Sequence, residues 1–220
     1  WKELHERCGE CPWPQPTGWQ SPFCPNNLHR TMMQRVAPYT LRGFLYYQGE
    51  EDVSRYEGYS DMMIALVKQW RMDWNDWSLP FLFVQLPMYL AIDTEDDKKW
   101  AMQREQQAIA AAMLKRVGMI SMTDCGEFDN IHPLDKETPG TRLALLAEQM
   151  VYGTGEEWTP TVQQMYSDGT ALYLVFDHVA DGLVIHASQP ETCQIAGADG
   201  VYYPAKAEVL HSNIVRVSAD

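Results

Sequence analysis

An aspartate and a histidine stand three residues apart in the segment Asp129-Asn130-Ile131-His132-Pro133. Residues at this spacing in a tight turn can share one side, so the Asp129 carboxylate could accept a hydrogen bond from a ring nitrogen of His132. That bond would fix the tautomer of the imidazole and leave its second nitrogen free to take a proton from a nucleophile. The spacing permits a general base. It also permits an ordinary loop histidine beside a capping aspartate, because short motifs recur by chance.

Alternating apolar segments indicate the elements that must position this pair. Continuous apolar runs typical of buried parallel strands alternate with segments whose apolar residues recur at helical spacing. Strands are expected over 41–47, 81–87 and 119–123, and helices over 28–36, 59–74, 100–116 and 141–152. This order predicts a doubly wound α/β sheet, with the Asp129 loop after its third strand.

Polar residues follow two of these expected strands. Gln48, Gly49 and Glu50 come directly after the first strand, and Gln85 interrupts the apolar run of the second. Arg104 stands near the start of the next helix. The carboxyl ends of parallel strands are where an open α/β sheet places ligand-handling groups, so all five residues are candidates for a site. A capped turn, a structural amide and an exposed ion pair remain the simpler interpretations.

The sequence changes character towards both ends. Residues 1–27 interleave prolines with tryptophans, which breaks helix and strand periodicity and predicts an irregular segment. Residues 28–156 form the partial α/β domain, and 157–220 are expected to be β-rich. In this tail, short apolar runs separated by Asp-Gly turns predict antiparallel strands. These strands are expected over 171–176, 183–186, 194–196 and 214–217.

Composition narrows the classes of partner. The chain has 220 residues, 45% of them hydrophobic, and a formal net charge of −13, so it can bury a sizeable core. Nucleic acid and anionic membrane surfaces are both disfavoured, because their binding needs clustered Lys and Arg. No apolar run has the length of a membrane span, and the first residues lack a signal-peptide pattern. Since the chain starts at Trp1 and not at Met, we interpret it as a piece of a longer or processed polypeptide.

Three cysteines crowd the first segment. Cys8, Cys11 and Cys24, together with His29, give C-x2-C followed by C-x4-H, which are ligand types that a structural zinc site could use. The spacing is looser than in usual zinc motifs. A disulfide with one free thiol, or three ordinary cysteines, is therefore the favoured interpretation, and we predict no cofactor.

Several motifs, taken in order, resemble the sialate O-acetylesterase family of SGNH-type hydrolases. They are Gly43 to Glu50, Trp70-Arg71, Leu79 to Pro87, Arg104-Glu105-Gln106, and Asp129 to Pro133 followed by Gly140 to Ala144. The resemblance covers roughly Asn26 to Asp220, and ordered motifs are far more specific than any single one. It implies a flavodoxin-like three-layer sandwich and serine-dependent removal of acetyl groups from sugar hydroxyls without a metal.

The resemblance also implies roles for residues. His132 matches the catalytic base and Asp129 its orienting acid, while the Gln48-Gly49-Glu50 turn stands where related hydrolases place an oxyanion-hole asparagine. A side-chain amide there could donate to the developing oxyanion, which contributes about 3 kcal/mol in comparable enzymes. Glu50 would hold the turn. Arg71 is one candidate partner for Glu50, and Arg104 and Gln85 are candidates for substrate binding.

One part of the family pattern has no counterpart here. The family's nucleophile lies in a Gly-Gln-Ser-Asn stretch after the first strand, and neither Ser21, Ser54, Ser60 nor Ser121 fits it. We therefore interpret the chain as the later part of such an esterase, and we expect it to be inactive, or nearly so, in isolation. Its partners would be the N-terminal segment of the same enzyme and an acetylated sugar, either sialic acid or a glycan.

Two rival interpretations remain open. The first is an acetylxylan or other neutral-sugar esterase, because a sialate carboxylate would need Arg or Lys and this chain is acidic. The second is a non-catalytic carbohydrate-binding or structural fragment, which would explain the missing serine. For the compartment, the family resemblance implies a secreted, periplasmic or lysosomal-type setting.

Overall fold

The computed structural model describes Cys24 and residues 26–37, 39–90, 97–155, 160–185 and 193–219. The chain divides into two compact units, Trp1–Gly153 and Thr154–Asp220. Most of the segment 1–27, for which an irregular structure was predicted, lies outside the described residues. No helix within the described residues has both the length and the apolar character that crossing a lipid bilayer requires.

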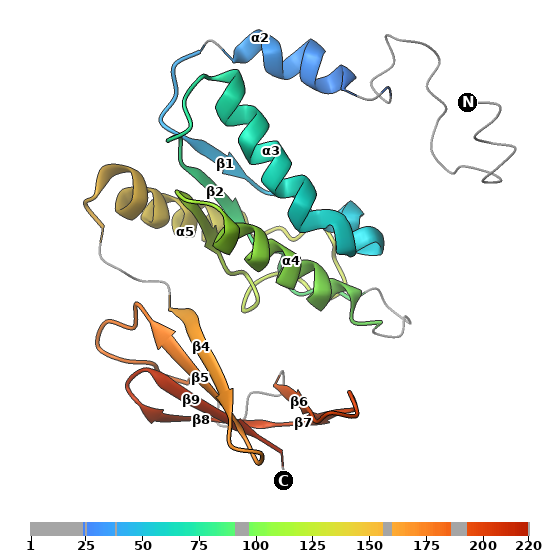
Figure 1. The fold of residues 1–220 in the computed structure, drawn as a ribbon, viewed down its shortest axis with the longest axis vertical. Coiled ribbons are helices and arrows are strands. Elements are labelled where there is room, and N and C mark those ends of the chain that lie inside the picture. Colours follow the sequence, from blue (N-terminus) through green and yellow to red (C-terminus); the bar gives the residue numbers. More distant parts are fainter. Residues whose placement is uncertain are drawn as a thin grey trace, which may run out of the picture. The chain divides into compact units, whose positions relative to one another are not determined.

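A parallel sheet lies at the centre of the first unit (Figure 1). Its strands within the described residues are β1 (Phe44–Tyr46), β2 (Phe81–Val84) and β3 (Val117–Ile120), in the order β1-β2-β3. All four residues of β2 are buried, as expected for a central strand covered on both faces. The predicted α/β class is therefore confirmed for this unit. β3 lies slightly earlier in the chain than the predicted strand.

Two helices cover one face of this sheet. α3 (Tyr59–Asp73) and α4 (Lys99–Met113) pack on each other and on the sheet. Val67 of α3 is fully buried in one hydrophobic cluster with Phe81 and Phe83 of β2. Both helices lie where apolar residues at helical spacing predicted them.

A third helix covers the opposite face (Figure 1). α5 (Glu137–Ala147) continues into the π-helical turn η3 (Glu148–Tyr152). A Cβ added to Gly118 of β3 would lie 2.9 Å from Leu146 and 3.2 Å from Leu82. The absence of a side chain at Gly118 therefore lets α5 approach the sheet closely, and the sheet has helices on both faces.

Short helical segments connect the remaining parts of this unit. The π-helical η1 (His29–Met33) runs into α2 (Gln34–Val36), which confirms the helix predicted over 28–36. A 3-10 helix, η2 (Glu50–Gly58), begins directly after the turn that follows β1. Three acidic residues lie in its first turn. Their negative charges interact favourably with the unpaired backbone N–H groups at the start of a helix.

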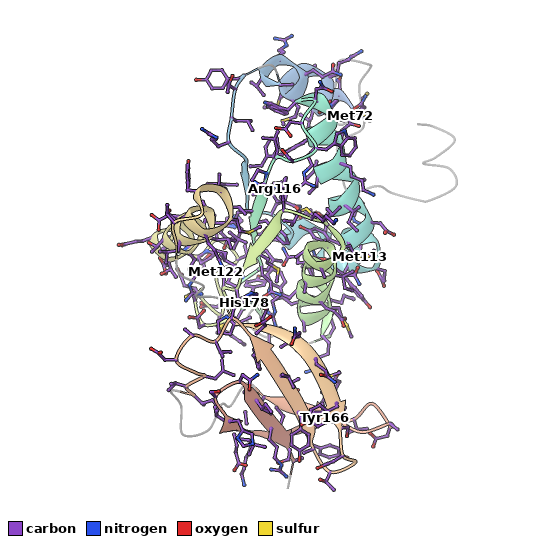
Figure 2. All side chains as sticks on the ribbon, turned by 60° about the vertical axis from the view of Figure 1, so that its left-hand side comes forward. Met72, Met113, Arg116, Met122, Tyr166 and His178 are labelled. Atoms are coloured by element: carbon purple, nitrogen blue, oxygen red, sulfur yellow. The ribbon has the colours of Figure 1, made fainter. Side chains whose placement is uncertain are left out.

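Arg71 corrects one expectation. Its side chain is 5% exposed and donates from Nε to the Leu79 carbonyl at 2.9 Å, and from Nη2 to the carbonyls of Lys115 at 2.9 Å and Arg116 at 3.1 Å. These carbonyls precede β2 and β3, so Arg71 lies at the amino edge of the sheet. Arg116 marks this edge in Figure 2, and Met122 follows the other end of β3. Arg71 is therefore neither the partner of Glu50 nor available to a substrate carboxylate.

The second unit is antiparallel β structure, which confirms the predicted β-rich tail. β4 (Thr161–Ser167), β5 (Leu172–Asp177), β9 (Ile214–Ser218) and β8 (Lys206–His211) pair in that order, and β6 (Gln194–Ala196) pairs with β7 (Tyr202–Pro204). The strand predicted over 183–186 is wrong for its described residues. Val184 is 71% exposed, and the Leu183 N–H bonds to Ser212 in the turn between β8 and β9. His186 lies outside the described residues.

Candidate functional site

Tyrosines and a carboxylate fix the side chain of Gln48 in the turn after β1. Gln48 Oε1 accepts a hydrogen bond from the Tyr46 hydroxyl at 3.2 Å, and its Nε2 donates to Asp52 Oδ2 at 2.7 Å. The Tyr59 hydroxyl donates to the Gln48 carbonyl at 3.1 Å. Burial, with the charges of Asp52 and Glu50, raises the pKa of Tyr46 to about 12, and burial also raises the pKa of Tyr59. Both hydroxyls therefore stay protonated and act as donors at neutral pH.

The backbone of this turn depends on Gly49. Its φ is 146°, a conformation that residues with a Cβ rarely adopt. A Cβ there would lie 3.1 Å from Gln103 Nε2 and 3.2 Å from Gln107 Nε2. Gly49 thus permits both the turn and the close approach of two amide groups from α4.

Gln103 and Gln107 were not predicted as site residues. Both are fully buried. Gln107 Oε1 accepts a hydrogen bond from the Leu86 N–H at 2.9 Å, and Nε2 donates to the Gln48 carbonyl at 3.3 Å. Neither amide atom of Gln103 has a hydrogen-bond partner within the described residues. Their spacing could have indicated that they lie together, because residues three or four apart share a helix face. Ala110 lies on the same face and is buried.

Gln85 and Arg104, the two predicted substrate-binding residues, are brought together through the main chain of α4. Gln85 Nε2 donates to the Arg104 carbonyl at 3.0 Å, and its backbone N–H donates to the Ile120 carbonyl at 2.9 Å. Gln85 therefore ties the end of β2 to α4. The Arg104 side chain is half-buried, and its role in substrate binding stays a prediction.

The loop that carries Asp129 and His132 joins β3 to α5. Both residues are exposed, so the imidazole is accessible to another group. The His132 backbone N–H donates to Asn130 Oδ1 at 3.0 Å. Within the described part of the chain no hydrogen bond joins the Asp129 carboxylate to the His132 ring. Their pairing and catalytic roles stay predictions.

Glu127 braces this loop and was not singled out from the sequence. Its Oε2 accepts a hydrogen bond from Asn130 Nδ2 at 2.8 Å, and its Oε1 accepts one from the Leu134 N–H at 2.6 Å. These donors, the Leu134 amide first, lower the pKa of Glu127. The carboxylate therefore spans the chain on both sides of His132.

An ion pair closes the base of the loop. Arg142 of α5 donates from Nη1 and Nη2 to both oxygens of Asp124, at 2.7 Å and 2.6 Å. Nη1 also donates to the Ser121 carbonyl at 2.6 Å. The hydrogen bonds from Arg142 lower the pKa of Asp124 to about 2. This bidentate arrangement fixes where the chain leaves β3 relative to α5.

The turn after β1 and the loop after β3 meet at the carboxyl edge of the sheet. The Lys136 ammonium lies over the Tyr47 ring, 5.4 Å from its centroid. Burial raises the pKa of Tyr47, and the negative charges of Glu50 and of Asp135 in the loop raise it further. The loop also contacts the segment after β2, because the Leu90 N–H donates to the Phe128 carbonyl at 2.8 Å. Segments far apart in sequence thus share one edge of the first unit.

The zinc hypothesis involves residues at another place in this unit. Cys8 and Cys11 lie outside the described residues, and Cys24 is half-buried. His29 Nε2 pairs with Asp73 Oδ2 at 2.6 Å. Within the part of the chain that the structure describes, no group of three or more His, Cys, Asp or Glu residues could hold a metal ion.

Comparison with known proteins identifies relatives of this chain. A family model described as carbohydrate esterase, sialic acid-specific acetylesterase matches residues 16–151. The sialate O-acetylesterase of Rattus norvegicus is 29% identical over 142 residues, which are 57% of this chain and 26% of the relative. That of Homo sapiens is 28% identical over 161 residues, 66% of this chain and 30% of the relative.

A solved structure is similar over more of the chain. The crystal structure of a carbohydrate acetylesterase from Xanthomonas citri aligns with a TM-score of 0.76 and 32% identity, covering 84% of this chain and 44% of that one. The chain thus spans less than a third of the curated relatives' length and less than half of the solved chain. The family match contains the turn after β1 and the loop after β3. Because it extends over more than half of the sequence, the chain belongs to the carbohydrate esterase family of sialic acid-specific acetylesterases.

Proposed function

We propose that this chain forms part of a serine-type carbohydrate O-acetylesterase that hydrolyses acetyl esters on sugar hydroxyls. His132 would be the general base, Asp129 would orient it, and the Gln48 turn would supply part of the oxyanion hole. The observation that carries the proposal is the Lys136–Tyr47 contact, which joins the two predicted site segments at one sheet edge. The helices on both faces of the parallel sheet support the SGNH-type three-layer sandwich implied by the family.

The nucleophile would be a serine in a segment of the enzyme outside these residues. His132 would take the proton of the serine hydroxyl as its oxygen attacks the acetyl carbonyl, and would return it to the sugar oxygen as that group leaves. A water molecule, deprotonated by the same imidazole, would then release acetate from the serine. The exposure of His132 fits this role, and catalytic hydrogen bonds are often loose before substrate binds.

Gln48 can act on the oxyanion while keeping its place in the turn. A side-chain amide carries two N–H groups, and one of those of Gln48 is held by Asp52 at 2.7 Å. The other can donate to the carbonyl oxygen as it becomes negative, a contribution of about 3 kcal/mol in comparable enzymes. Tyr46 and Tyr59 hold the amide and its main chain in place.

The test uses the complete enzyme, which joins this chain to the nucleophile segment. His132→Ala should lower kcat on p-nitrophenyl acetate by at least about a thousandfold, as expected for removal of a catalytic base. His211→Ala, at an exposed residue of β8 in the second unit, is the matched control and should leave kcat unchanged. Full activity of the His132→Ala enzyme would refute the proposal.

The isolated chain offers a second test. It should turn over p-nitrophenyl acetate no faster than its His132→Ala variant, because the proposed nucleophile lies elsewhere. Robust turnover that is lost on Ser21→Ala or Ser54→Ala would place the nucleophile within these residues and overturn this part of the proposal.

The burial of Arg71 favours a neutral-sugar esterase as a second candidate. Arg71 donates to backbone carbonyls at the other edge of the sheet and is not available to a sialate carboxylate. Arg104 remains as the candidate cation. Rates of the complete enzyme on O-acetyl sialic acid and on acetylated xylan separate the two, and a preference for xylan would establish the second candidate. We also propose the secreted, periplasmic or lysosomal-type compartment that the family resemblance implies.

A further inference from the structure

The chain around His132 is held by a continuous set of hydrogen bonds that starts at Glu127. One carboxylate oxygen accepts from the Asn130 side chain at 2.8 Å, and the Asn130 side-chain oxygen accepts from the His132 N–H at 3.0 Å. The other carboxylate oxygen accepts from the Leu134 N–H at 2.6 Å. The backbone that carries the imidazole is thus fixed at His132 itself and again two residues later, at Leu134.

Glu127 also forms the turn that presents Asp129. The Asn130 N–H donates to the Glu127 carbonyl at 3.1 Å, and the two residues form an isolated antiparallel bridge. A bond between residues three apart closes a tight turn, which places Phe128 and Asp129 at its tip. Main chain and side chain of Glu127 therefore act on both residues of the predicted catalytic pair.

We propose that Glu127 is a positioning residue for His132. The Glu127 carboxylate bridges Asn130 and Leu134 and thereby fixes the direction of the imidazole. This inference rests on the proposed function of His132. A carboxylate suits the role because it accepts from two donors at once and because bonds to a charged acceptor are the stronger ones. Glutamine would retain one acceptor oxygen, and alanine would retain none.

The expected loss lies in the chemical step. Displacing a catalytic group by about 1 Å can cost about a hundredfold in rate. In the complete enzyme, Glu127→Ala should therefore lower kcat about a hundredfold, and Glu127→Gln, which keeps one of the two bonds, about tenfold. KM should change by less than about twofold, because the carboxylate acts on the base and not on the bound sugar. Asn130→Ala should lower kcat in the same direction.

The control is Glu137→Gln. It removes the same charge from an exposed residue in the first turn of α5, close to the loop but outside this set of bonds, and it should leave kcat unchanged. Amide exchange in the 220-residue chain gives a second readout. Glu127→Gln should accelerate exchange at His132 and Leu134 and leave the amides of β2 unchanged, which also shows that the variant is folded.

The outcomes separate this inference from the proposed function. Loss of activity in His132→Ala together with full activity in Glu127→Gln and Glu127→Ala would overturn the positioning role alone. Full activity in all three would overturn the role of His132 as well. A loss in Glu137→Gln equal to that in Glu127→Gln would overturn the positioning role, because the effect would then belong to charge and not to the bridge. Unchanged exchange at His132 and Leu134 in Glu127→Gln would also count against it.

Discussion

Gln107 and Gln103 offer a direct test of how the carboxyl edge of the sheet is held together. Both are fully buried in α4, and leucine has a similar volume and an equal or better helix propensity. Their hydrogen bonding differs. Gln107 accepts from the Leu86 N–H at 2.9 Å, whereas neither amide atom of Gln103 has a partner within the described residues. The same substitution should therefore destabilise the chain at Gln107 and not at Gln103.

The magnitude for Gln107→Leu follows from the partners left behind. The Leu86 N–H would become a buried donor without an acceptor, which costs about 1–3 kcal/mol. The carbonyls of Gln48 and Val84 lose only long contacts, at 3.3 Å and 3.4 Å, and the Gln48 carbonyl keeps its bond from Tyr59. The apolar side chain returns part of the loss, so we expect a net destabilisation of about 2 kcal/mol.

Gln103→Leu removes two polar atoms that have no partner to lose. The change should be neutral or stabilising by about 1 kcal/mol, because it ends the cost of burying an unpaired amide. Urea unfolding of the chain, followed by tryptophan fluorescence, measures both variants through the midpoint at unchanged slope. Equal destabilisation by the two substitutions, or a stabilising Gln107→Leu, would refute the hydrogen-bond assignment from which both values come.

Three further predictions concern other parts of the first unit. Arg71→Met should destabilise it by about 3 kcal/mol, because three carbonyls lose a hydrogen bond from this buried guanidinium, and an unchanged urea midpoint would contradict this. Gly49→Ala should lower both the urea midpoint and the kcat of the complete enzyme, because φ is 146° and a Cβ would crowd two amides; a wild-type kcat would show that the turn tolerates strain. The contribution of Asp124 to stability should be fully present above pH 3.8, its ordinary pKa, and lost as the pH falls towards about 2. The difference in urea midpoint between wild type and Asp124→Asn should shrink over that range, and a constant difference would contradict the lowered pKa.

The parallel sheet could be predicted because its central strand is apolar at every position. All four residues of β2 are buried, and such runs separated by amphipathic helices leave few alternatives. The second unit was harder. Every residue of β4 is exposed, so its sequence shows no alternation of buried and exposed positions. The strand expected over 183–186 was wrong because that apolar run is not buried, and its Val184 faces solvent. Local hydrophobicity predicts strands only where burial follows it.

The strand ends that carry the candidate residues could be predicted from the sequence, whereas the residues that support these segments could not. The turn at Gln48 and the loop at Asp129 follow strand ends, where ligand-handling groups are expected from topology alone. Gln107 and Glu127 look like ordinary polar residues in the sequence, because the groups that pair with them become neighbours only in the fold. Gln107 meets a carbonyl 59 residues away, and no local pattern encodes such a contact.

The charges around the Gln48 turn bear on how the proposed reaction would be shared among parts of the enzyme. Glu50 and Asp52, after burial, raise the pKa of Tyr46 to about 12, so the turn disfavours additional negative charge. An imidazolium forming on His132 would be stabilised by such a field, whereas an oxyanion would be opposed by it. In the proposed role, a single amide N–H of Gln48 would contribute about 3 kcal/mol against that opposition, as in comparable enzymes. In the proposed enzyme, the segment that would bring the serine would therefore also need to bring further oxyanion donors, and backbone N–H groups beside the nucleophile are best suited to supply them.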